Sequence, residues 1–189
     1  AMIAAEDGMN LTGALITHYH PDHCGGSMMG MRIEGVTELL AVTQMPVHVQ
    51  ADEAEWVTKV TDLTMADLTT HASGDAVMVG EIPIQLLHTP GHTPGSQCFY
   101  VNGCLVSGDT LFLDGCGRTD LPGGDPEALY YSLTQTLAQV DLARAELDAR
   151  GVAYGPVQLG AMIEIPAAAL MVRTFFKYFD FLSIGTNDL

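Results

Sequence analysis

The ten residues THYHPDHCGG, at positions 17–26, constrain this chain more than any other stretch. Three histidines and one aspartate fall within six positions, between a strand-like run and a glycine pair. His18 and His20 are two apart, so on an extended segment they face the same side. Pro21 favours that extended geometry at His20, because proline disfavours the helical region for the residue before it. The segment therefore predicts a cluster of side chains aimed at one point.

The side chains of this cluster are those that bind transition metals. Asp22 and His23 follow the two facing imidazoles and can point back at a neighbouring position. Neutral imidazole and carboxylate suit zinc, iron or manganese. The pattern favours two adjacent cations. The alternative is a surface histidine cluster that holds no metal.

Two later stretches supply further ligands of the same kind. HTPGHTPGS (88–96) places His92 in a loop rich in proline and glycine, and SGDT (107–110) places Asp109 just after a strand. A carboxylate there could bridge two metals, which lie about 3.5–4 Å apart in two-metal hydrolases. All seven histidines of the chain lie at or before position 92, so its second half has none.

Composition excludes several kinds of partner. The net charge is −16 and the pI about 4.4, so the surface repels phosphate backbones and anionic lipid. The four cysteines contain no C-x-x-C pair, and no apolar run approaches the length of a membrane span. We expect reduced thiols, a cytoplasmic protein, a small-molecule substrate, and neither nucleic acid nor membrane as a partner. The sequence leaves the oligomeric state open.

The pattern of apolar and turn-forming residues predicts an α/β protein. The first part is rich in hairpins: two strands turn within residues 75–87, and a second pair turns at Asn102-Gly103 within 97–109. The last part predicts a strand, a helix and a strand, which implies a parallel sheet. The remaining expected elements are strands at 13–20 and 45–50, a helix at 51–60, a helix from Asp125-Pro126 towards Arg150, and the C-terminal units at 157–166, 167–179 and 180–188.

The motifs H-x-H-x-D-H, G-H-T and G-D-T resemble those of the metallo-β-lactamase fold, a four-layer αββα sandwich. The stretch GCGRTDLPGGDPEALYYSL (115–133) resembles its glyoxalase II-like and persulfide dioxygenase-like branches. The resemblance covers about residues 1–140, and it implies a domain truncated at both ends. It assigns His18, His20 and His92 to one metal, Asp22 and His23 to a second, and Asp109 to a bridge between them. It also places Arg118 and Asp120 at the substrate; the alternative for this pair is a salt-bridged loop.

This resemblance implies a hydrolase that uses a metal-bound hydroxide on a thioester such as a hydroxyacyl-glutathione. One or two Zn²⁺ ions would be the cofactor, and Asp22 would also orient the nucleophile. The family usually completes the second site with a later histidine, which this chain lacks. The alternative is therefore a persulfide dioxygenase with one Fe²⁺ held by His18, His92 and Asp109.

The end of the chain resembles a second family. GAMIEIPAAAL and DFLSIGTNDL are similar to the phosphoenolpyruvate-binding C-terminal barrel of phosphotransferase-system enzyme I. The resemblance implies a vestigial Mg²⁺ site at Glu164 and Asp188 in a β-α-β fragment, residues 141–189, of a TIM-type barrel that normally needs about 250 residues. We expect this fragment to be inactive, with the two pieces meeting near Val140. The chain as a whole could then be a non-catalytic chimera.

Overall fold

The computed structural model describes residues 6–28, 30–102, 104–112 and 115–134, together with two strands at 160–163 and 181–184. Its first sheet is parallel, with strands in the order β1-β4-β5. Its second is antiparallel, in the order β6-β7-β8-β9. The bounds are β1 Ala14–Leu15, β4 Val47–Gln50, β5 Leu68–His71, β6 Ala76–Val79, β7 Ile82–His88, β8 Gln97–Val101 and β9 Cys104–Val106.

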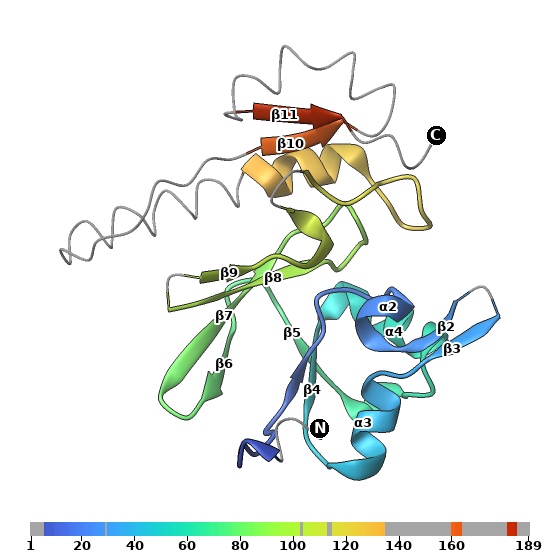
Figure 1. Cartoon of the computed structure of the whole chain (residues 1–189), viewed down its shortest axis with the longest axis vertical. Helices are drawn as coiled ribbons and strands as arrows, with labels where there is room; N and C mark the ends of the chain where they lie inside the picture. The colour runs from blue at the N-terminus through green and yellow to red at the C-terminus, as the bar shows by residue number, and fades with distance from the viewer. Residues whose placement is uncertain are drawn as a thin grey trace.

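Short helices cover one side of the parallel sheet (Figure 1). Helices α3 and α4 lie on one side of it, and the antiparallel sheet lies on the other (Figure 1). A small hairpin of β2 and β3 follows α2. The bounds are α2 Pro21–Cys24, α3 Val36–Val42, α4 Ala54–Val60, β2 Gly26–Met28 and β3 Met31–Ile33, with 3-10 turns η1 at Ala51–Glu53, η2 at Met65–Asp67 and η3 at Gly108–Thr110.

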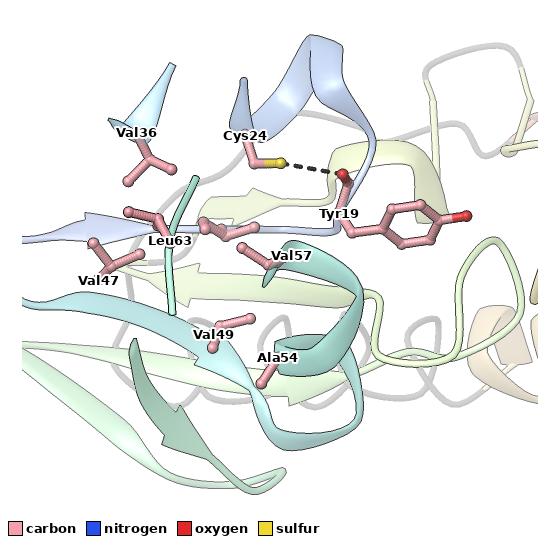
Figure 2. Packing of buried hydrophobic residues seen from close by; sticks show 9 residues of the cluster. Tyr19, Cys24, Val36, Val47, Val49, Ala54, Val57 and Leu63 are labelled. Atoms are coloured by element: carbon pink, nitrogen blue, oxygen red, sulfur yellow. Dashed lines mark hydrogen bonds between the residues drawn. The ribbon is translucent and has the colours of Figure 1, made fainter. Parts of the chain in front are cut away.

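The main core lies between the parallel sheet and the helices. Val47 and Val49 of β4 are fully buried against Ala54 and Val57 of α4 (Figure 2). Cys24 belongs to the same cluster, and its thiol donates a hydrogen bond to the carbonyl of Tyr19 over 3.1 Å. Apolar burial of this kind supplies most of the free energy of folding. It also fixes the segment 16–24, which carries four of the predicted ligands.

The two sheets are joined directly beside this segment. The backbone N–H of Gln97, the first residue of β8, donates to the carbonyl of Thr17 over 2.9 Å. The side-chain amide of Gln97 donates to the carbonyl of Ile16 over 2.7 Å, and both groups are buried. The carboxyl end of β1 therefore meets the start of β8, and the predicted ligand loops meet at the same place.

Most of the expected elements are present. Both hairpins form as predicted, and Asn102 has the positive φ of 49° that suits a tight type I′ turn. The helix over residues 126–134 begins as predicted, with the Asp125 carboxylate accepting the N–H groups of Glu127 and Ala128. Strands β10 (Gly160–Ile163) and β11 (Phe181–Ile184) pair in parallel, as expected. The predicted helix at 167–179 and the continuation from 135 to 150 lie outside the described residues.

Some predictions about the first part were incomplete. It is not built of hairpins alone, because β1, β4 and β5 form a parallel sheet. Strand β5 has the sequence LTTH and is largely exposed, so it lacks the apolar signal of a strand. Helix α3 begins after Gly35, which has no side chain to act as a recognisable cap. Among the described residues, no helix is both long enough and apolar enough to span a bilayer.

Candidate metal centre

Local backbone geometry presents the first group of ligands. His18 and His20 follow β1, and His20 is extended at φ −60° and ψ 139°, as Pro21 requires. Pro21 then occupies the first turn of α2, where its missing N–H has no consequence. Asp22 and His23 lie on this single turn of helix. The motif therefore bends by one helical turn directly after its second histidine.

The other two ligands arrive from the antiparallel sheet. His92 lies in the loop between β7 and β8, and Asp109 lies in η3 just after β9. His92 Nε2 is 2.9 Å from His20 Nδ1 and 3.4 Å from Asp109 Oδ2. His23 Nε2 is 3.2 Å from Asp109 Oδ1. Five of the six predicted ligands thus converge, counting His18, whose Nε2 is 3.9 Å from Asp109 Oδ2.

The arrangement fits a cation. Within the part of the chain that the structure describes, His18 Nε2 is fully buried and has no hydrogen-bond partner, a cost that a protein seldom tolerates without a ligand. Two donor sets meet the distances for a metal: His18 with His20 and His92, and His18 with His23 and Asp109. Imidazole nitrogens and one carboxylate are suitable donors for zinc or iron.

The electrostatics keep His18 and His20 in the neutral form that binds metal. Burial, helped by the neighbouring imidazoles of His23 and His92, lowers the pKa of His18 to about 2. Burial and His92 also lower the pKa of His20. Both rings are therefore neutral near pH 7, with lone pairs free. Burial alone would raise the pKa of Asp109, but the hydrogen bond from His23 and the imidazoles around it lower it overall, so this side chain is a carboxylate.

A backbone carbonyl orients His92. The Nδ1 of His92 lies 2.7 Å from the carbonyl oxygen of Arg118, so Nδ1 carries the proton and Nε2 faces the cluster. The loop approaches this closely because residue 117 is glycine: a Cβ there would lie 2.7 Å from His92 Nδ1. Gly117 also donates its N–H to the carbonyl of Asp109 over 2.7 Å. One loop thus supports two of the ligands.

Arg118 and Asp120 form an exposed pair beside the cluster. The Arg118 guanidinium donates to both carboxylate oxygens of Asp120, over 2.7 and 2.8 Å. This bidentate ion pair matches the salt-bridged loop that is the alternative to a substrate-binding role. What the sequence did not reveal is that the main chain of Arg118, rather than its side chain, touches a ligand.

Asp22 lies further from the cluster than the other predicted ligands. Its carboxylate is 3.6 Å from His23 Nε2, and its side chain is 56% exposed. Glu164 and Asp188, the expected magnesium ligands, lie outside the described residues. His48 and His71 bond to each other at 2.9 Å, away from the cluster.

Sequence reasoning missed Glu53, whose carboxylate is fully buried. It accepts hydrogen bonds from the backbone of Tyr19 and from Thr93 and Gly95, residues next to the ligands on both loops. In the sequence Glu53 is one of several acids at the start of a helix, where the helix dipole favours them on the surface. No local pattern distinguishes it from Asp52 or Glu55.

A fold of two sheets with a histidine cluster at their junction defines a class of metal-dependent proteins. The family model for the metallo-beta-lactamase superfamily matches residues 1–155. The chain belongs to this superfamily. A second model, for the PEP-binding domain of PEP-utilising enzymes, matches residues 129–189.

The relatives include two kinds of enzyme. A hydroxyacylglutathione hydrolase of Alkalilimnicola ehrlichii is 38% identical over 137 residues, which cover 72% of this chain and 46% of the relative. The mitochondrial persulfide dioxygenase ETHE1 of Bos taurus is 27% identical over 190 residues, covering 97% of this chain and 67% of the relative. A solved structure, TTHA1623 in a di-iron-bound form, is 29% identical at a TM-score of 0.59, over 72% of this chain and 69% of that one.

The C-terminal part has a different relative. A phosphoenolpyruvate-protein phosphotransferase of Cupriavidus necator is 57% identical over 58 residues, which cover 30% of this chain and 10% of the relative. The chain spans about half the length of the hydroxyacylglutathione hydrolase and a tenth of the phosphotransferase.

Proposed function

We propose that residues 1–140 form the metal-dependent hydrolase part of the chain and act on a thioester such as a hydroxyacyl-glutathione. The observation that carries this proposal is the convergence of His18, His20 and His92, with the buried Nε2 of His18 finding no hydrogen-bond partner among the described residues. The hydroxyacylglutathione hydrolase relative supports the choice of substrate.

The residues of the site divide the work. A bound Zn²⁺ would supply Lewis-acid chemistry, by polarising a carbonyl and by lowering the pKa of a water so that it can lose a proton and act as a nucleophile near neutral pH. His18, His20 and His92 would hold one ion, and His23 and Asp109 would provide donors for a second position. The His92 ring is fixed by the Arg118 carbonyl, which keeps Nε2 directed at the site.

Asp22 is placed to orient a nucleophile. Its side chain is the most exposed of the six candidate ligands, so it is open to solvent beside the cluster. In the ion pairs of the described residues, the partner of this carboxylate is His23 Nε2 at 3.6 Å. At that distance the carboxylate can still accept a hydrogen bond from an incoming water. Arg118, held by Asp120, offers a cation to the carboxylates of a glutathione moiety.

The test measures metal and turnover on the same samples. The chain is purified without added metal, its metal content is measured by elemental mass spectrometry, and S-lactoylglutathione hydrolysis is followed after loading with Zn²⁺. His92→Ala should lose bound metal and turnover, whereas His71→Ala, which removes an imidazole away from the site, should retain both. A folded, zinc-loaded chain that hydrolyses no thioester would overturn the proposal.

The second candidate is a persulfide dioxygenase that uses one Fe²⁺. It is favoured by the ETHE1 relative, which aligns with 97% of this chain, and by the triad of His18, His92 and Asp109, which leaves coordination positions open for O₂. Oxygen uptake by the iron-loaded chain with glutathione persulfide would select this activity over hydrolysis. No uptake by that sample would exclude it.

We also propose that residues 141–189 are a β-α-β fragment of a barrel domain that utilises phosphoenolpyruvate. The parallel pairing of β10 and β11 and the Cupriavidus necator relative support this origin. A cytoplasmic location is part of the same proposal. A cooperative thermal transition of the whole chain would argue against a chimera that does not fold stably.

A further inference from the structure

Glu53 is a buried carboxylate that bonds to both ligand loops. Its residue lies in η1, between β4 and α4, and its exposed fraction is 0%. Oε1 accepts the N–H of Tyr19 over 2.7 Å and the hydroxyl of Thr93 over 2.7 Å. Oε2 accepts the N–H of Gly95 over 2.6 Å. A buried charge is costly unless several donors satisfy it, and here three short bonds do so.

The three donors flank the proposed metal ligands. Tyr19 lies between His18 and His20, and Thr93 directly follows His92. These two segments are more than 70 residues apart in sequence, yet one carboxyl group bonds to both. The position of Glu53 therefore controls the separation between the first two imidazoles and the third.

The donors around Glu53 suit a carboxylate. The Thr93 hydroxyl donates to Oε1, and its oxygen lies 2.7 Å from the Ser96 hydroxyl, which can donate to it because the Ser96 oxygen itself accepts the N–H of Thr93. Residue 95 must be glycine, because a Cβ there would lie 2.7 Å from Oε2. An amide in place of the carboxylate would turn an NH₂ group towards either the Gly95 N–H or the Tyr19 N–H, so two donors would face each other.

We infer that Glu53 is a positioning residue that sets the spacing of His18, His20 and His92 for a metal ion. The inference rests on the proposed function, because it assumes that these imidazoles bind a cation. Glu53 does not touch the ion. It fixes the backbone on both sides of the site, so that the lone pairs of the three imidazoles meet at one point before the metal arrives.

The test compares metal affinity in Glu53→Gln, Val57→Ala and the parent chain. Each is titrated with Zn²⁺ against a chromophoric chelator, and the Co²⁺ form is examined by its visible absorption, which reports ligand geometry. Glu53→Gln should bind Zn²⁺ about 10–100-fold more weakly, the range for loss of a group that orients metal ligands. Its Co²⁺ spectrum should also change. Val57→Ala leaves a cavity in the same core, which also contains Tyr19 and Cys24, but it removes no hydrogen bond to either ligand loop, so it should lose stability and keep its affinity.

A second variant covers failure of the first to fold. Thr93→Val keeps the shape of the side chain but removes one of the three donors, and it should show a smaller loss of affinity with the same spectral change. Unchanged affinity in either folded variant would overturn the inference, as would an equal loss in Val57→Ala. A parent chain that binds no Zn²⁺ would overturn the proposed function and this inference with it, which separates that failure from a failure of Glu53 alone.

Discussion

Replacing Gly117 with alanine tests whether the loop after Asp109 sets the metal affinity. The new Cβ would lie 2.7 Å from His92 Nδ1 and closer still to the carbonyl oxygen of Asp109, both well inside the ordinary contact distance of about 3.4 Å. Relieving the contact with His92 alone needs a shift of about 0.7 Å, which would lengthen the bond from His92 Nδ1 to the Arg118 carbonyl from 2.7 Å to about 3.4 Å, beyond the range of a good hydrogen bond. The contact with Asp109 needs a larger shift still. His92 then loses its fixed orientation.

Loss of such a partner costs about 10–100-fold in metal affinity, or about 1.4–2.8 kcal/mol. The assay is a competitive Zn²⁺ titration of Gly117→Ala. Gly80→Ala is the matched control, because its φ of +61° penalises alanine in a turn that touches no ligand, with open space around it. That control should be less stable by about 1 kcal/mol and bind zinc as the parent does. Equal affinities in Gly117→Ala and the parent would refute the reasoning.

Further predictions concern acid stability, thiol reactivity and the core. The folded-state pKa of His18 is about 2, below its unfolded value of 6.5, so the unfolded chain binds more protons between these values and stability falls as the pH falls. Urea titrations of the metal-free chain should show a loss of about 2 kcal/mol from pH 6.5 to 5 through this residue, which His18→Gln should lack; parallel slopes would contradict it. Burial raises the pKa of Cys24 to about 12, so an alkylating agent should label exposed Cys104 and spare Cys24 in the native chain, as mass spectrometry would show. Leu86 of β7 is 1% exposed, so Leu86→Ala should lower the free energy of unfolding in urea by about 2–5 kcal/mol. A negligible decrease would mean that the second sheet contributes little to the core.

The candidate ligands could be read from the sequence because they are local. The H-x-H-x-D-H spacing places four side chains just after one strand and on one helical turn, and its three imidazoles lie at one region, whereas Asp22 lies further out. The hairpins could be predicted for the same reason, since Asn102-Gly103 determines its own turn. Strand β5 was missed because pairing with β4, rather than an apolar period, holds it in place. Helix α3 was missed because Gly35 at its start offers no cap side chain, although Glu38 accepts the Gly35 N–H over 2.9 Å.

The sequence by itself determined the identity of the candidate metal-binding side chains and the class of fold that carries them. Only the tertiary structure decided how those side chains are held: Glu53 reaches Tyr19 across 34 positions and Gly95 across 42, and His92 reaches the Arg118 carbonyl across 26. Two of these three bonds involve a backbone N–H group and one involves a backbone carbonyl. Nearly every residue type has both groups. A contact made through the main chain leaves no residue-specific pattern in the sequence, so it emerges only when the two sheets meet.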